Sequence, residues 1–598
     1  MPRRGYGFPG LRSLALAGRN YLFYTIYCII IKNIMPSSPL APQHVQGQPR
    51  LTVAYFSMEI GLKSTIPTFA GGLGILTADL MQSCADLGVP AVCVTGCWKH
   101  GYLRQTLNPD GSQRYEEIEW DIAAHLQKRP ERVTVMIEGQ PVVVGAWQLD
   151  LKGEKGTVPV IFLDTSLPEN PPEVHRITHR LYGGDLSMRI RQELVLGIGG
   201  IKMLRALGYT DIGTYHMNEG HAAFLTLELL RERQWQDEAV RRSCAFTTHT
   251  PIEAGHDVFP YDLAERIAGD NLPWHIKKIA GENALSMTKL AMTMSRFTCG
   301  VSRIHAEVSR KMFPGVQIDS ITNGVHHLTW SSKEMQALFD AKSRGWREDP
   351  SILTATCRDF EDGELWKAHQ AAKMRLMTEV NRRTGLAFDV EILTIASARR
   401  VVSYKQPELL YDNLKRLADV CQGRVQIVHS GNAHPSDSFA QGVIQRMVER
   451  SHELKDKVKI AYLENYNPDL ARLLVQGADV WLNTPMRLHE ASGTSGMKAC
   501  LNGVLNFSTL DGWWIEGYER DPEAGWRIGP LVQATSDDTA RSIDAEDIYT
   551  ELQYQIIPEY YYTARARWIR RMKRAIGLSG YFNSHRCVQE YLEKAWKQ

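Results

Sequence analysis

Short apolar runs alternate with amphipathic stretches from residue 51 to about residue 512. Residues 51–57 (LTVAYFS) and 90–96 (PAVCVTG) are nearly continuous apolar runs, which are typical of buried strands. Between them, apolar positions recur at helical spacing after the glycine-rich segment 71–74 (GGLG). The same alternation continues at 213–221, which leads into a helix, and at 244–250. This pattern predicts an α/β architecture built on parallel strands.

A second and more regular alternation follows a helical, polar region at about 331–386. Apolar runs predict five strands, and the segments between them have helical patterns, including one near 407–421. The predicted strands are 390–396, 424–431, 458–465, 479–483 and 504–512. Five strands with intervening helices predict one doubly wound domain. Together the two halves predict two Rossmann-like lobes that face a central cleft.

The first 50 residues differ from the rest of the chain. No acidic residue precedes Glu59, and basic residues flank a short apolar run at 21–31. That run is shorter than the roughly 20 residues that cross a bilayer. A basic flank with a short apolar run also resembles a signal peptide. The Pro- and Ser-rich stretch after Met35 favours instead a disordered leader or a misassigned start.

These boundaries predict four parts of the chain. We expect the leader or misassigned start at 1–50, an N-terminal α/β lobe with a helical linker at 51–386, a C-terminal Rossmann-like lobe at 387–545, and C-terminal helices at 546–598. The last part is rich in aromatic and basic residues. We interpret it as packing helices with a solvated arginine face.

Composition excludes several classes of protein. The chain has 69 Lys and Arg against 67 Asp and Glu, a net charge of +2, so it lacks the basic excess of a nucleic-acid-binding protein. Hydrophobic residues make up 43% and charged residues 23%, as in ordinary globular proteins, which excludes a polytopic membrane protein, and we expect no membrane association. Its ten Cys residues form no CxxC pair, which predicts reduced, buried thiols in a reducing compartment, so we expect a cytoplasmic location.

The segment with the most chemistry is 487–512, RLHEASGTSGMKACLNGVLNFSTLDG. It joins a strand to a helix through a loop of small and hydroxyl residues, and Lys498 lies just inside the helix. Such a lysine can carry a Schiff base or neutralise a phosphate. Small residues let a ligand approach the backbone, and a helix N-terminus favours an anion. The residues alone predict a phosphate or sugar site, with an ordinary capped helix as the alternative.

The segment EASGTSGMK (490–498) resembles the pyridoxal-phosphate lysine motif of the glycogen and α-glucan phosphorylases. Four more segments resemble that family in the same order: AGGLG (70–74), ITNGV (321–325), ARRVVSYKQ (398–406) and LENYNPDLA (463–471). The resemblance extends from about residue 51 to residue 515 and is to the shorter bacterial and archaeal type. It implies a glycosyltransferase B-type fold and a possible homodimer.

The resemblance also implies a cofactor, pyridoxal 5'-phosphate, held by Lys498 as a Schiff base, so that the lobe at 387–545 would bind pyridoxal phosphate and phosphate. Two phosphates at close range repel each other unless cations neutralise them. Arg399 would face the cofactor phosphate, Arg400 would face inorganic phosphate, and Lys405 would touch both. Backbone amides add donors: those of Thr494 and Ser495 to the cofactor phosphate, and that of Gly72 to inorganic phosphate.

By the same resemblance, inorganic phosphate protonates the glycosidic oxygen and attacks C1 while the cofactor phosphate shuttles the proton. The products are α-D-glucose 1-phosphate, formed with retention, and a shortened α-1,4-glucan. The sugar would contact Glu490, Ser492, Gly493, Asn323 and His249. Two alternatives are a nucleotide-sugar-dependent glucosyltransferase of the same fold, similar to glycogen synthase, and a degenerate glucan-binding protein.

The sequence departs from the family pattern at several positions. Gln406 and Asn432 replace basic residues, so we expect a less positive phosphate site. Gly496 replaces an Asn before the Met-Lys pair, and Cys299 stands where the family has Asn.

One group of residues suggests a metal. His216, Glu219 and His221 do not have the HExxH spacing of a zinc helix, so we expect no metal site and assign them to the cleft lining.

Overall fold

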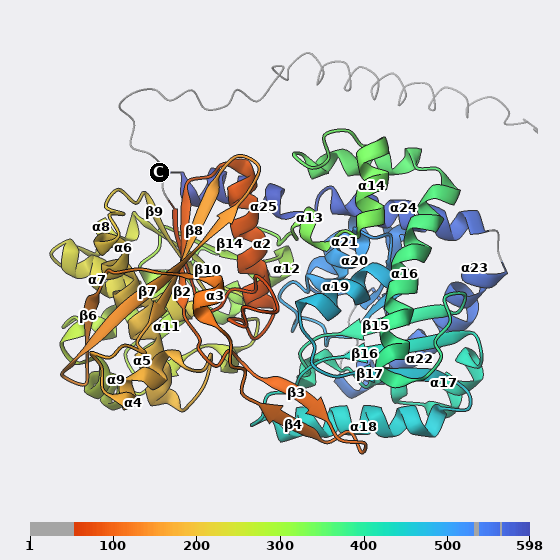
Figure 1. Cartoon of the computed structure of the whole chain (residues 1–598), viewed down its shortest axis with the longest axis horizontal. Helices are drawn as coiled ribbons and strands as arrows, with labels where there is room; N and C mark the ends of the chain where they lie inside the picture. Colours follow the sequence, from red (N-terminus) through yellow and green to blue (C-terminus); the bar gives the residue numbers. More distant parts are fainter. Residues whose placement is uncertain (1–52, 532–536, 563–564, 598) are drawn as a thin grey trace, which may run out of the picture. The chain divides into compact units, whose positions relative to one another are not determined.

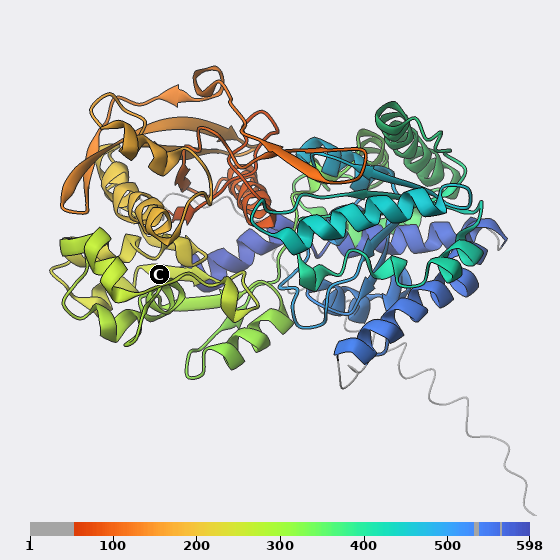
Figure 2. The same ribbon diagram turned by 90° about the horizontal axis from the view of Figure 1, so that it is seen from below.

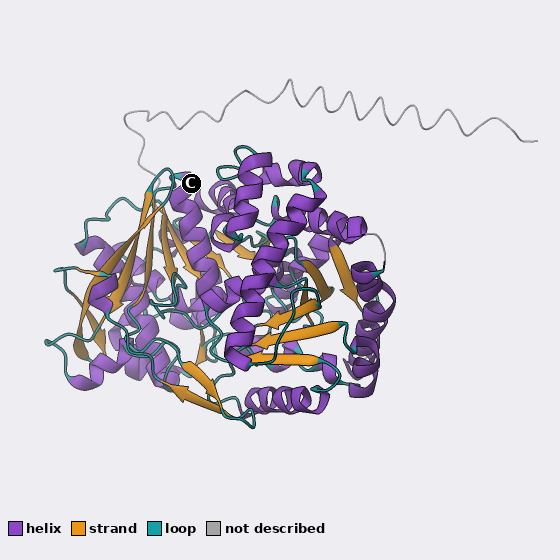
Figure 3. Cartoon of the chain, turned by 45° about the vertical axis from the view of Figure 1, so that its right-hand side comes forward, coloured by secondary structure: helices purple, strands orange, loops and turns teal. Residues whose placement is uncertain are grey.

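The computed structural model describes residues 53–531, 537–562 and 565–597; the predicted leader at 1–50 lies outside the described residues. Helices surround two large sheets (Figure 3), which confirms the mixed α/β architecture with parallel strands. Across the described ranges, every helix is too short or too polar to cross a membrane. The nine described Cys residues are buried and free, as predicted.

The first sheet has ten strands. Its centre is parallel: β1 (Val53–Ser57) lies between β2 (Ala91–Gly96) and β9 (Thr214–Asn218), and β10 (Cys244–Thr247) pairs with β9. The order is β14-β13-β10-β9-β1-β2-β8-β7-β5, with β6 on β7; the further bounds are β5 Gln127–Lys128, β6 Val133–Ile137, β7 Gln140–Lys152, β8 Thr157–Asp164, β13 Phe297–Gly300 and β14 Asp319–Ser320. The antiparallel end formed by β5 to β8 was not predicted.

The second sheet has six parallel strands in the order β17-β16-β15-β18-β19-β20. The bounds are β15 Leu393–Ala398, β16 Val425–Ser430, β17 Lys459–Leu463, β18 Val480–Asn483, β19 Leu505–Thr509 and β20 Gly525–Ile528. The first five confirm the predicted strands. The sixth, β20, was missed because its four residues, GWRI, are too few to show a period. The chain reverses direction across the sheet between β15 and β18, which is a topological switch point.

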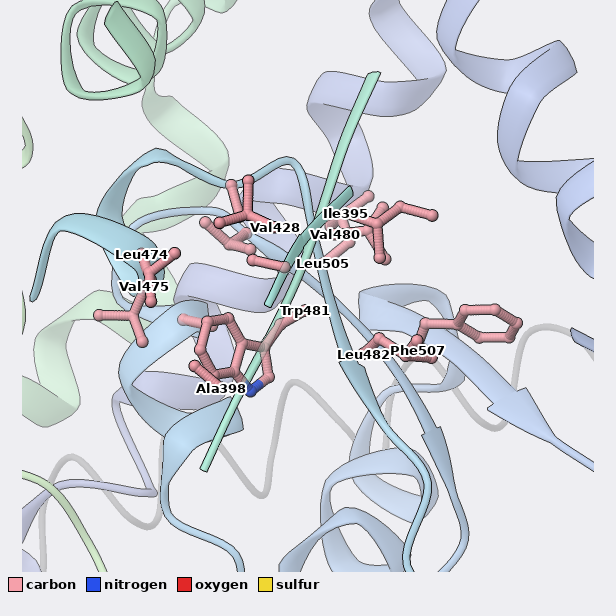
Figure 4. Packing of buried hydrophobic residues seen from close by; sticks show 14 of the residues in the cluster. Ile395, Ala398, Val428, Leu474, Val475, Val480, Trp481, Leu482, Leu505 and Phe507 are labelled. Carbon is pink, nitrogen blue, oxygen red and sulfur yellow. The ribbon is translucent and has the colours of Figure 1, made fainter. Parts of the chain in front are cut away.

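The strands of the second sheet are apolar on both faces because buried apolar side chains pack against them in one core (Figure 4). Every residue of β15 is buried, and Ile395, Val428 and Leu505 pack together in one cluster. Leu474 and Val475 join this cluster from α19 (Pro468–Gly477). Parallel sheets covered on both faces have continuous hydrophobic runs rather than alternating ones.

One helix differs from its predicted bounds. The helix predicted near 407–421 begins only at α17 (Leu414–Cys421), because single 3-10 turns occupy Ser403–Lys405 and Leu409–Tyr411. The glycine-rich segment opens α2 (Gly72–Leu87), as predicted. The long helix of the linker region is α16 (Asp362–Thr384).

The C-terminal region is helical, as predicted, and it returns to the first sheet. Its helices include α22 (Asp537–Glu551), α24 (Arg565–Ser579) and α25 (Ser584–Tyr591). Helix α25 packs beside α2, where the hydroxyls of Ser83 and Ser584 are 2.6 Å apart (Figure 1). Figure 2 shows this blue segment running back among the elements of the first sheet.

Candidate active site

The predicted site residues all lie around one cavity of about 500 Å³. Its walls are loops at the carboxyl ends of parallel strands, the edge at which open α/β sheets bind ligands. Arg399 and Arg400 directly follow β15, and the loop from Pro485 to Thr494 follows β18, on the two sides of the switch point. The lining includes Gly72, His249, Asn323, Arg399, Arg400, Lys405, Glu490, Ser492, Gly493, Thr494, Ser495 and Lys498.

Lys498 lies on the short helix α20 (Ser495–Cys500) and is 8% exposed. Its ammonium is 3.9 Å from the centre of the Trp330 ring. Burial lowers the pKa of Lys498 to about 8, although the carboxylate of Asp79 acts in the opposite direction. The indole N–H of Trp330 donates to both oxygens of Asp79, at 3.0 and 2.9 Å. A buried amine with this pKa is partly neutral near pH 7 and can therefore act as a nucleophile.

Arg399 is held by the loops of the second sheet. Its Nη2 donates to the Lys405 carbonyl and to Thr484 Oγ1, both at 3.0 Å. Its Nε is buried and has no hydrogen-bond partner within the described ranges. Burial lowers the pKa of Arg399 to about 10, so the guanidinium is still charged at neutral pH. A buried cation with an unused donor suits an anionic ligand.

Lys405 and Glu490 form an ion pair, with Nζ and Oε2 2.8 Å apart. Their side chains are 16% and 13% exposed. Burial opposes the charge of Lys405, but Glu490 and Tyr404 raise its pKa above the ordinary value. The residue predicted to bind phosphate thus contacts one predicted to bind sugar.

Asp511 orders the loop of Glu490, and the sequence analysis missed it. Its Oδ2 accepts the amides of Glu490 and His489, at 2.7 and 3.1 Å, and its Oδ1 accepts that of Gly512, at 2.9 Å. Burial, with a contribution from the Glu490 carboxylate, raises the pKa of Asp511 to about 7. The available signal was an acid at the end of a predicted strand, in LDG after β19.

The first sheet contributes a second polar group. His249 Nε2 lies 2.6 Å from Asn218 Oδ1, and the His249 amide donates to Glu219 Oε2 at 2.7 Å. Burial lowers the pKa of His249 to about 4, so the imidazole is neutral at pH 7. Asn323 Oδ1 and Ser492 Oγ are buried without a partner in the part of the chain that the structure describes. Buried polar atoms of this kind require a partner, which a bound sugar can supply.

Glu59, also missed by the sequence analysis, shapes the glycine-rich loop. Its Oε2 accepts the amides of Ala70 and Gly71, at 2.6 and 3.0 Å, while Tyr182 donates to Oε1 at 2.9 Å. An added Cβ at Gly72 would meet no described atom within 4 Å, so the space beside that backbone is open to a ligand.

Other residues that the sequence analysis singled out have different surroundings. Glu219 and His221 line the cavity, as expected. His216 does not, because it is fully buried in β9, where the Trp596 N–H contacts its Nδ1 at 3.0 Å. Cys299 is buried and contacts Thr247 Oγ1 at 3.3 Å.

The departure at Gly496 has a steric explanation. A Cβ at this position would overlap the Asn506 side-chain oxygen and approach the Trp513 ring to 2.8 Å. The side chain of an Asn does not fit here, since Asn506 and Trp513 already fill the space.

The sequence of this chain is similar to those of known proteins. The carbohydrate phosphorylase family model matches residues 252–525. The chain is 37% identical to maltodextrin phosphorylase of Thermococcus litoralis over 91% of this chain and 70% of the relative. It is 34% identical to glycogen phosphorylase of Mycobacterium tuberculosis over 90% of this chain and 70% of the relative. It is 33% identical to glycogen phosphorylase of Aquifex aeolicus over 91% of this chain and 86% of the relative.

Proposed function

Because this chain belongs to the carbohydrate phosphorylase family, we propose that it is an α-glucan phosphorylase. It cleaves α-1,4-glucan, either glycogen or maltodextrin, with inorganic phosphate and releases α-D-glucose 1-phosphate with retention. The observation that carries the proposal is the gathering of Arg399, Arg400, Lys405 and Lys498 at one cavity with polar groups suited to a sugar. The proposed arrangement is two Rossmann-like lobes around this cavity, as in glycosyltransferase B-type enzymes.

Pyridoxal 5'-phosphate fits the residues around Lys498. The amine is buried with a lowered pKa, and the Arg399 Nε donor is unused among the described residues. Lys498 would hold the aldehyde end of the cofactor, while Arg399, Lys405 and the amides of Thr494 and Ser495 would bind its phosphate. When bound, the cofactor supplies a phosphate group that exchanges a proton with the substrate phosphate.

The chain's own residues neutralise charge and orient the substrates. Arg400, Lys405 and the Gly72 amide bind inorganic phosphate, and the open space beside Gly72 admits it. Their positive charge lets two phosphate groups lie close together, which repulsion otherwise prevents. This also places an anionic oxygen where positive charge develops at the sugar C1.

Sugar recognition uses the remaining polar groups of the cavity. Glu490 accepts hydrogen bonds from ring hydroxyls, and the Gly493 amide donates. Asn323 Oδ1 and Ser492 Oγ, both partnerless within the described ranges, take sugar hydroxyls as partners. The neutral imidazole of His249 adds a further polar contact. A homodimer and a cytoplasmic location stay predictions.

The test is release of glucose 1-phosphate from maltooligosaccharides with and without inorganic phosphate. We expect phosphate-dependent release by the wild type, an absorbance band between about 330 and 430 nm that borohydride fixes to Lys498, and loss of both in Lys498→Ala. Lys415→Ala, at an exposed lysine of α17, is the matched control and keeps both. Glucosyl transfer from a nucleotide sugar without phosphate would contradict the proposal, as would full activity of colourless protein.

A further inference from the structure

Three buried histidines lie together outside the lining of the cavity. His326 and His327 stand at the start of α13 (His327–Trp330), and His585 lies on α25. Each imidazole offers one nitrogen such that the three atoms lie within 4.8 Å of one another. The three side chains come from residues that are at most 3% exposed. Phosphorolysis, as proposed above, uses none of them.

Backbone carbonyls determine the tautomers of two of these imidazoles. His327 Nε2 lies 2.8 Å from the Arg347 carbonyl oxygen, and His585 Nδ1 lies 3.3 Å from that of Glu348. A carbonyl oxygen accepts only, so these two nitrogens carry the protons. The lone pairs are then on His327 Nδ1 and His585 Nε2. Both atoms are buried and have no hydrogen-bond partner in the described part of the chain.

A buried carboxylate completes the group. Asp86 of α2 is 5% exposed, and its Oδ2 lies 2.8 Å from His326 Nε2 and 3.5 Å from His585 Nε2. His326 Nε2 faces this oxygen with its proton and His585 Nε2 faces it with its lone pair, and within the described ranges no lysine or arginine pairs with Asp86. A buried carboxylate requires a countercharge.

His326 holds this carboxylate in place. Its Nδ1 accepts the Thr329 amide at 3.2 Å, so its Nε2 carries the proton that Asp86 Oδ2 accepts. Metal-binding carboxylates are commonly held by such a hydrogen bond, and metal-binding imidazoles donate their other N–H to a carbonyl, as His327 and His585 do here.

We propose that His327 Nδ1, His585 Nε2 and the carboxylate of Asp86 bind a divalent transition-metal ion of the zinc class. Two imidazoles and a carboxylate are a donor set that Zn²⁺ accepts. His326 is a positioning residue for Asp86. No ligand comes from a sequence motif, since Asp86, the His326–His327 pair and His585 lie far apart in the chain.

The ion joins three segments behind the active site. Helix α2 begins at Gly72, α13 ends at Trp330, which covers Lys498, and α25 packs on α2 (Figure 1). The site is therefore structural: it ties the C-terminal helix to the two elements that place Gly72 and Trp330.

The experiment uses the untagged full-length chain, stripped of metal with a chelator and titrated with Zn²⁺ or Co²⁺. We expect one metal per chain by elemental analysis, a visible d–d band with Co²⁺, and a melting temperature that rises with free Zn²⁺. His327→Gln and His585→Gln lose the band and the rise in melting temperature. His452→Gln, at an exposed histidine of α18 (Ser438–Leu454), is the control and keeps both.

Two further variants separate metal binding from a packing role. Asp86→Asn keeps the shape of the side chain but loses its charge, so it loses the Co²⁺ band. His326→Gln keeps a donor to Asp86 and weakens Zn²⁺ binding by roughly 10- to 100-fold, the usual effect of removing such a positioning group. The proposal is overturned if the wild type binds no Co²⁺ at one per chain, or if His327→Gln and His585→Gln bind it as the wild type does.

Discussion

Lys405 Nζ and Glu490 Oε2 are 2.8 Å apart, so the residue proposed to bind phosphate and the residue proposed to bind sugar neutralise each other's charge. Asp511 holds the backbone of Glu490 in place, because its carboxylate accepts a hydrogen bond from the Glu490 amide. In the proposed function, phosphate competes with a carboxylate for Lys405, and glucose competes with an ammonium for Glu490. We therefore expect the binding of the two substrates to be coupled through this ion pair.

Glu490→Gln tests this coupling. Removal of the carboxylate frees Lys405 for phosphate, and we expect the KM for phosphate to fall about tenfold, equivalent to about 1.5 kcal/mol for one charge-assisted hydrogen bond. The KM for maltooligosaccharide rises, since the amide accepts sugar hydroxyls less strongly. Steady-state kinetics with each substrate varied separately give both values.

The control is Glu453→Gln, which removes a carboxylate from an ion pair on the surface of α18, where Glu453 is 49% exposed. Both KM values stay unchanged in this variant. Equal KM values for phosphate in the wild type and Glu490→Gln would show that Lys405 does not bind that substrate.

The lowered pKa of Lys498 predicts how the rate of cofactor binding depends on pH. Only the neutral amine attacks an aldehyde, and burial lowers the pKa of Lys498 to about 8 from an ordinary value of 10.5. Reconstitution of the stripped protein with pyridoxal phosphate should therefore accelerate as the pH rises and reach half its maximal rate near pH 8. Stopped-flow absorbance measures this rate.

Asp79→Asn removes the carboxylate that raises the pKa of Lys498, so the midpoint should move to lower pH. A midpoint near pH 10 in the wild type would mean that the amine is not buried as described.

Arg400→Ala should raise the KM for phosphate at least tenfold and lower kcat, because a guanidinium–phosphate contact is charge-assisted and worth more than about 1.4 kcal/mol. Arg400→Lys retains the charge without the bidentate fork and should recover part of the loss. Initial rates over a range of phosphate concentrations test both variants. Unchanged kinetics in Arg400→Ala would place the anion site elsewhere.

Gly496→Ala should destabilise the protein by about 1–3 kcal/mol, the usual cost of overpacking. The new methyl group meets Asn506 and Trp513, and the start of α20 must shift with Lys498. Gly363→Ala is the matched control in α16, since no described atom lies within 4 Å of its added Cβ. The melting temperature should fall for Gly496→Ala and should stay unchanged for Gly363→Ala. Equal melting temperatures for the two variants would contradict the close packing at Gly496.

The amino-acid sequence determined the alternation of strands and helices and five strands of the second sheet. It did so because these strands are buried on both faces and therefore appear as continuous apolar runs, as at β15. It also placed Lys498 at the start of a helix, since small and hydroxyl residues precede it in the chain. These are local properties, and a local pattern is sufficient to predict them.

Tertiary structure decided what depends on residues far apart in the chain. The pair of Lys405 with Glu490 and the group of His326, His327 and His585 each join separate segments. No periodicity marks such contacts, because each arises from how the loops at strand ends and the helices around the sheets come together. Burial then determines the chemistry of individual side chains. It lowers the pKa of Lys498. It also keeps His216 out of the cavity lining, although Glu219 and His221, only a few residues further along the chain, do line the cavity.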